Sequence, residues 1–198
     1  LNMVNLSIMN FDISEEQEAL LEIVDKFCQE LRPIENQCFL EGRFNDQLIE
    51  LAKRAHLTGL PIDEEYGGSG GTTRQVAIAV EEIARACAAT STTYAAHLSL
   101  AVQFIQMYGT EGQKRQFIPP LTTGRSIAAF ALTEAGGGSD AGAIQTTATR
   151  SNGSYILNGS KTYITNAPEA DIFVLLATMD RSLGTKGIIA LVMESDTP

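Results

Sequence analysis

The residues most suggestive of chemistry form a glycine-rich cluster, GGGSDAGA, at residues 136–143. Gly136, Gly138 and Ala141 satisfy the spacing G-x-G-x-x-A, which in a dinucleotide-binding fold marks a pyrophosphate-binding turn between a strand and a helix. The residues that follow, AIQTTATRSNG, favour strands and turns, so the required helix is missing. The cluster therefore predicts a polar turn at the mouth of a β domain, where backbone amides approach an anion. A tight loop without a ligand is the alternative.

Other side chains with chemical potential are less promising. Glu134 and Asp140 could form a catalytic carboxylate pair, but we expect both to be structural. His56 and His97 lie on predicted helices without a metal-spaced partner, so we expect them at the surface or satisfied as caps, and we expect no metal site. The GGSGG loop at 67–71 lacks the Lys-Ser/Thr ending of a phosphate-binding P-loop and predicts a helix connector.

The first part of the chain, up to residue 120, is predicted to be helical and to support these residues. Up to residue 120, apolar residues recur at helical spacing, and three capping boxes mark helix starts. Proline and glycine supply the predicted ends. We expect five helices: Ser14 to Pro33, about Asn45 to Leu57, Thr72 to about Cys87, about Ser91 to Tyr108, and a short one from Thr110 to Pro119-Pro120.

After Gly124 the pattern changes to short runs rich in β-branched residues. Asn152-Gly153 and Asn158-Gly159 are strong hairpin signals, because type I′ turns need positive φ at both central residues. The expected strands are 126–133, 145–150, 155–157, 161–165, 171–179 and 187–194, with a three-strand meander around the two hairpins. The sequence therefore predicts an α+β protein with an all-α domain at 1–125 and an incomplete antiparallel β domain at 126–198.

Charge and composition exclude several functions. With 24 acidic and 14 basic residues, the net charge of -10 repels nucleic acid and anionic lipid. The three cysteines lack C-x-x-C spacing, so the sequence signals neither a disulfide framework nor a zinc site. No apolar run approaches the roughly 20 residues of a membrane span. The first residues contain no Lys or Arg, unlike signal or transit peptides. We expect a cytoplasmic protein, or one of the mitochondrial matrix if the source is eukaryotic.

One longer stretch carries a family resemblance. The run ALTEAGGGSDAGA at 131–143 resembles the first signature of the acyl-CoA dehydrogenase family of flavoenzymes. Three further stretches agree with that family in the same order: EYGGSGG at 65–71, GTEGQKR at 109–115 and NGSKTYITN at 158–166. The flanking pattern extends the resemblance over nearly the whole chain.

The resemblance implies where FAD would bind. In that family a helical domain, a β domain and a C-terminal four-helix domain meet around the flavin. Carried over by position, the isoalloxazine ring would lie along Phe130, Leu132 and Thr133, with a second wall of Tyr163, Ile164 and Thr165. Gly138 and Ser139 would approach the FAD pyrophosphate, and Ser139 would also contact the thioester arm of acyl-CoA.

Two of these positions depart from the family pattern. Tyr163 stands where tryptophan is common, and Phe130 stands where tyrosine is often found. Both residues keep an aromatic ring, but Tyr163 lacks the indole N–H of tryptophan and Phe130 lacks the hydroxyl of tyrosine. We therefore expect a changed flavin potential or substrate preference rather than loss of the site.

The implied reaction is α,β-desaturation of an acyl-CoA thioester, with electron-transferring flavoprotein as the usual acceptor and a dimer or tetramer as the assembly. The family's glutamate base comes from the C-terminal helical domain, which has no counterpart here, so we expect no catalytic residue in this chain. We expect the chain alone to be inactive, to bind FAD weakly or not at all, and to self-associate through unpaired strand edges. The alternatives are an acyl-CoA oxidase, a flavin monooxygenase relative, or a non-catalytic interaction module of the same fold.

Overall fold

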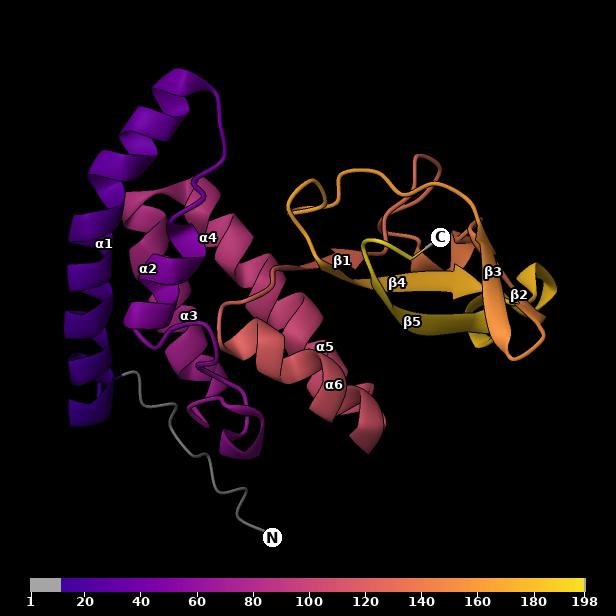
Figure 1. Ribbon diagram of the computed structural model, residues 1–198, viewed down its shortest axis with the longest axis horizontal. Coiled ribbons are helices and arrows are strands. Elements are labelled where there is room, and N and C mark those ends of the chain that lie inside the picture. Colours follow the sequence, from indigo (N-terminus) through magenta and orange to yellow (C-terminus); the bar gives the residue numbers. More distant parts are fainter. Residues whose placement is uncertain (1–11, 198) are drawn as a thin grey trace, which may run out of the picture.

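The computed structural model describes residues 12–197 and confirms the predicted α+β class. Helices fill one half of the molecule and the strands lie in the other, with β1 leading from one to the other (Figure 1). Within the described residues, no helix is long and apolar enough to cross a membrane. The helices of the first half are α1 (Glu15–Glu41), α2 (Leu48–Arg54), η1 (Glu64–Tyr66), α3 (Thr73–Ala86), α4 (Ala88–Ala95), η2 (Ala96–Val102), α5 (Gln103–Tyr108) and α6 (Glu111–Thr122). Two short helices, η3 (Ala141–Ala143) and η4 (Arg181–Gly187), lie between strands.

The three predicted capping boxes are confirmed at the starts of α1, α3 and α6. In each box the hydroxyl of the capping residue accepts a hydrogen bond from the amide three residues later, and the glutamine there accepts one from the cap's own amide. Two otherwise unpaired amides are thereby satisfied, which explains why helix starts were readable from local sequence. The capping residues are Ser14, Thr72 and Thr110.

The predicted helix ends at prolines are wrong. Helix α1 continues through Pro33 to Glu41, and α6 continues through Pro119 and Pro120 to Thr122. Each interior proline removes a helical hydrogen bond at a cost of about 3 kcal/mol. Burial beyond the prolines offsets that cost, because the side chains of Cys38 and Leu121 are fully enclosed. Helix α2 is also shorter than the predicted 45–57.

The predicted helix over 91–108 exists as a continuous run from α4 through η2 to α5, with η2 in a π-helical conformation. His97, expected at the surface or satisfied as a cap, is 2% exposed on η2. Its Nδ1 accepts a hydrogen bond of 3.1 Å from the amide of Ala128, the first residue of β1. The expectation failed because nothing in the helix itself shows that a strand docks on it. His56 is exposed, as predicted.

The sheet is mixed rather than wholly antiparallel. Within the described residues it contains β1 (Ala128–Ala131), β2 (Thr147–Ser151), β3 (Ser154–Asn158), β4 (Ile172–Thr178) and β5 (Ile188–Glu194). Strand β4 is central: it pairs in parallel with β1, antiparallel with β5, and meets β2 through one parallel bridge. Because β1 and β4 run parallel, the chain must return to the start of the sheet before β4 begins. The segment 161–166 makes this return beside β1, from Thr133 back to Ala128.

The two predicted hairpins have different outcomes. Asn152 and Gly153 have φ of 48° and 83° and join β2 to β3, so the first hairpin is confirmed. The second is wrong, since residues 161–165 form no strand. Gly159 instead lies against Thr146, where an added Cβ would come within 2.4 Å of the threonine Oγ1. Here glycine permits a close approach of two segments rather than a turn.

Candidate functional site

The glycine cluster forms an exposed loop directly after β1. Glu134 and Gly137 exchange two backbone hydrogen bonds of 3.0 and 3.1 Å, which close a tight turn. Asp140 then accepts the amide of Gly142 at 3.2 Å. Among residues 12–197, no acceptor is found for the amides of Gly136, Gly138 and Ser139. The loop therefore presents a group of backbone donors to its surroundings, as anion-binding loops do.

The second glycine-rich loop, at 67–71, differs in this respect. The chain's own carbonyls accept its amides: Gly68 donates to Asp63, Ser69 to Gly59, Gly70 to Ile62 and Gly71 to Leu60. These amides are therefore not available to a phosphate. The geometry fits the predicted role of a helix connector.

Two segments distant in sequence lie side by side next to the glycine loop. The amide of Thr162 donates to the carbonyl of Thr133 at 3.0 Å, and the Lys161 ammonium donates to the carbonyl of Leu132 at 2.9 Å. An added Cβ on Gly138 would lie 3.5 Å from the Thr133 methyl group. The structure thus brings Leu132 and Thr133 beside the start of the segment 161–166, and Gly138 beside Thr133.

The remaining predicted site residues differ in their surroundings. Phe130 faces the helices, with its ring centroid 5.5 Å from that of Phe104. Ile164 lines an apolar groove of about 430 Å³, to which β1, β3, β4 and β5 and the segment 159–167 contribute. Tyr163 is 90% exposed and has a φ of 56°, a left-handed conformation that is costly for an aromatic residue. Ser139 is exposed and Thr165 is half-buried.

A buried ion pair joins the two segments. The Lys161 ammonium lies 2.8 Å from the Glu134 carboxylate, and each side chain is 8% exposed. The same carboxylate accepts the amides of Gln145 at 2.6 Å and Thr146 at 2.9 Å. Sequence reasoning gave Lys161 no role although it lies in the NGSKTYITN motif, because a lysine in a predicted strand is usually solvated.

Glu134 is unsuited to act as a base. Burial alone would raise its pKa, but hydrogen bonds from Lys161, Thr146 and two backbone amides lower the pKa to about 2. A base that removes an α proton needs a raised pKa. Asp140 is exposed, and its carboxylate accepts a hydrogen bond from the amide of Gly142.

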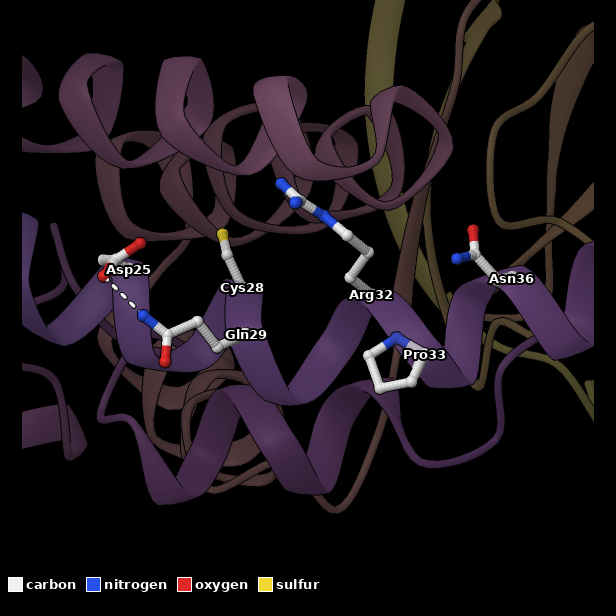
Figure 2. Close-up of a pocket in the computed structure, with 6 residues that line it drawn as sticks. All are labelled: Asp25, Cys28, Gln29, Arg32, Pro33 and Asn36. Atoms are coloured by element: carbon white, nitrogen blue, oxygen red, sulfur yellow. Dashed lines mark hydrogen bonds between the residues drawn. The ribbon is translucent and has the colours of Figure 1, made fainter.

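A separate cavity of about 530 Å³ lies along α1 (Figure 2). Asp25 and Gln29 bond to each other there, at 2.7 Å. Burial, with help from nearby Asp25 and Glu82, raises the pKa of the Cys28 thiol to about 11, so the sulfur stays protonated and unreactive. None of the predicted site residues lines this cavity. The lining residues are Asp25, Cys28, Gln29, Arg32, Pro33 and Asn36.

Comparisons with known proteins agree with the arrangement. Residues 14–125 match the acyl-CoA dehydrogenase N-terminal domain, and residues 129–198 match the middle domain of that family. The short-chain specific acyl-CoA dehydrogenase of Clostridium acetobutylicum is 40% identical over 94% of this chain and 49% of its own length. The chain therefore spans about half the length of the curated relatives it matches.

Solved structures give the same result. Butyryl-CoA dehydrogenase from Megasphaera elsdenii superposes with a TM-score of 0.89 at 37% identity, covering 96% of this chain and 51% of the other. A structure described as the electron transferring flavoprotein of Acidaminococcus fermentans has a TM-score of 0.91 at 37% identity, covering 96% and 50%. The FAD complex of PigA has a TM-score of 0.86 at 32% identity, with the same coverage, 96% and 50%.

Proposed function

Because the chain belongs to the acyl-CoA dehydrogenase family, we propose that it forms the N-terminal helical domain (1–125) and part of the middle β domain (126–198) of a flavoenzyme. The proposed reaction is α,β-desaturation of an acyl-CoA thioester. The observation that carries this proposal is the juxtaposition of free loop amides, the end of β1 and the 161–166 segment. The base that removes the α proton lies outside this chain.

The donors of the glycine loop fit a pyrophosphate. Among residues 12–197, no hydrogen-bond acceptor is found for the amides of Gly136, Gly138 and Ser139. Clustered backbone donors of this kind bind phosphate oxygens. We assign the FAD pyrophosphate to Gly138 and Ser139, and the thioester arm of the substrate to the exposed Ser139 hydroxyl. The FAD complex of the similar protein PigA supports FAD as the cofactor.

We propose that the flavin ring lies against the surface that the end of β1 and the 161–166 segment form together, since the two are hydrogen-bonded directly to each other. We assign one side to Phe130, Leu132 and Thr133, and the other to Tyr163, Ile164 and Thr165. When bound, FAD supplies the acceptor for the β hydrogen, which leaves the substrate as hydride. The hydroxyl of Thr133 and nearby amides would donate to the polar edge of the ring and stabilise its negative charge. An exposed aromatic ring held at strained φ, as in Tyr163, is typical of a functional surface.

The substrate class and partners follow from the relatives. A short-chain acyl-CoA is the proposed substrate, because the matched proteins include a short-chain specific dehydrogenase and a butyryl-CoA dehydrogenase. Electron-transferring flavoprotein is the proposed acceptor, supported by the similar chain in the Acidaminococcus structure. We further propose a dimer or tetramer, acting in the cytoplasm or, in a eukaryote, in the mitochondrial matrix.

The proposed function is tested with the protein expressed from its complete reading frame and loaded with FAD. Butyryl-CoA added without oxygen should bleach the visible flavin absorbance, with crotonyl-CoA as the product. Failure of several acyl-CoA chain lengths to bleach a bound flavin would refute the dehydrogenase. Rapid reaction of the reduced flavin with oxygen would instead favour an oxidase or monooxygenase, and absence of flavin binding a non-catalytic module.

Thr133→Val and Thr165→Val should each weaken FAD binding by about 3- to 10-fold, because each removes one hydrogen bond to the flavin while keeping the side-chain volume. Quenching of flavin fluorescence in a titration measures the dissociation constant. Thr149→Val, on the exposed side of β2, is the matched control and should leave FAD affinity unchanged. Equal affinities for all the variants would place the flavin elsewhere.

Gly138→Ala should weaken FAD binding by about 10-fold or more while leaving stability within about 0.5 kcal/mol. The added methyl group meets only the Thr133 methyl, at an ordinary 3.5 Å, so the fold tolerates it. It would nevertheless occupy the space through which the pyrophosphate approaches the backbone. The control is Gly112→Ala in α6, where the added Cβ would meet no neighbouring atom within 4 Å. Unchanged FAD affinity in Gly138→Ala would contradict the assignment of the pyrophosphate.

A further inference from the structure

One buried amide side chain connects three elements around the 161–166 segment. Asn166 is 8% exposed. Its Nδ2 donates to the carbonyl of Thr93 in α4 at 3.0 Å and to the carbonyl of Ala128 in β1 at 3.2 Å. Both N–H hydrogens of the amide are therefore used, each on a different element. Among residues 12–197, no other side chain forms hydrogen bonds that join the helical part, the sheet and this segment at once.

The backbone at Asn166 suits this role. Its φ is 70°, in the left-handed region that asparagine tolerates better than most residues. The amide of Ala167 donates to the carbonyl of Ile164 at 3.2 Å, and the amide of Glu169 donates to Asn166 at 3.0 Å. The chain therefore turns sharply at Asn166, and the side chain that permits the turn also anchors it.

The contact point on β1 is itself fixed from the helical side. The amide of Ala128 donates to His97 Nδ1, while the carbonyl of Ala128 accepts from Asn166. Both polar groups of this strand residue are thus bonded by side chains from outside the sheet. The 161–166 segment is held at its other end by the Lys161 and Thr162 hydrogen bonds to Leu132 and Thr133.

We propose that Asn166 is a positioning residue, which fixes Tyr163, Ile164 and Thr165 in register with α4 and β1. The proposal rests on the proposed function in one respect: these three residues matter to catalysis only if they form the flavin wall. Asn166 itself would not touch the flavin or the substrate. Its effect would be transmitted through the backbone that it holds.

Hydrogen exchange of the chain without flavin tests the anchoring directly. In Asn166→Gly, which keeps the left-handed backbone and removes both side-chain bonds, the amides of Ala167 and Glu169 should exchange about 10-fold faster. The amide of Thr162, at the separately held end, should change less. Asn152→Gly is the matched control, because Asn152 also has positive φ but is exposed in the β2–β3 turn. Unchanged exchange at Ala167 and Glu169 in Asn166→Gly would overturn the proposal.

FAD affinity separates this proposal from the proposed function. With the protein from its complete reading frame, Asn166→Gly should weaken FAD binding about 10-fold at a temperature where every variant is folded. Asn166→Asp keeps the shape but replaces the donor, so it should behave like Asn166→Gly. If the wild type binds FAD and both variants bind it equally well, the positioning role is refuted while the proposed function stands. If the wild type binds no FAD, the proposed function fails, and the exchange data still decide whether Asn166 anchors the segment.

Discussion

Lys161→Met is expected to lower the free energy of unfolding by about 3–5 kcal/mol, the range measured when one partner of a buried ion pair is removed. Methionine has a similar length and fills the space, so the loss is electrostatic rather than a cavity effect. Without Lys161, the Glu134 carboxylate remains buried with only neutral donors around it. The carbonyl of Leu132 also loses its donor.

Urea unfolding at neutral pH measures this loss, and the chain offers a matched control. Lys53→Met removes a lysine whose ion pair with Glu50 is exposed, so its cost should stay within about 1 kcal/mol. Adding Glu134→Gln to Lys161→Met should restore part of the stability, because a neutral amide leaves no unpaired charge. A Lys161 variant no less stable than the Lys53 variant would show that the buried pair contributes nothing.

Helix starts could be predicted from the sequence because their signals are local. A capping hydroxyl and its glutamine partner lie three residues apart, so Ser14, Thr72 and Thr110 were sufficient. Helix ends could not be predicted in the same way. Pro33 and Pro119 are local stop signals, but burial of residues further along the chain overrides them, and burial is a property of the tertiary structure.

In the candidate site, too, local signals were predictable from the sequence and long-range contacts were not. The two segments that the family resemblance assigns to the flavin lie side by side, since Thr162 donates to Thr133. Resemblance carries such spatial information, which composition lacks. The second hairpin was wrong because Lys161 and Asn166 hold their segment against partners 27 and 38 residues away. Bonds of that range leave no periodic trace, and an Asn-Gly pair looks the same whether glycine serves a turn or a close contact with Thr146.

The pH dependence of stability should reveal His97. Burial lowers the pKa of His97 from 6.5 to about 4, and the nearby backbone of Leu121 partly opposes this lowering. The unfolded chain therefore binds a proton at a pH where the native protein does not. The stabilisation is complete above pH 6.5 and is lost as the pH falls toward 4, by about 3 kcal/mol in total and about 2 kcal/mol by pH 5. The contribution of Glu134 is lost only between its ordinary pKa of 4.5 and about 2, so it does not overlap with the upper part of this window.

Denaturant unfolding at several values between pH 7 and 5 measures this slope. In His97→Gln the slope should largely disappear, because the glutamine oxygen can accept the Ala128 amide without ever taking up a proton. His56→Gln provides the matched control: the sequence contains two histidines, and His56 is exposed. A slope that persists in His97→Gln but disappears in His56→Gln would mean that the histidine between η2 and β1 does not sense pH. Loss of the slope in His97→Gln alone would show that docking of β1 on the π-helix depends on an uncharged imidazole.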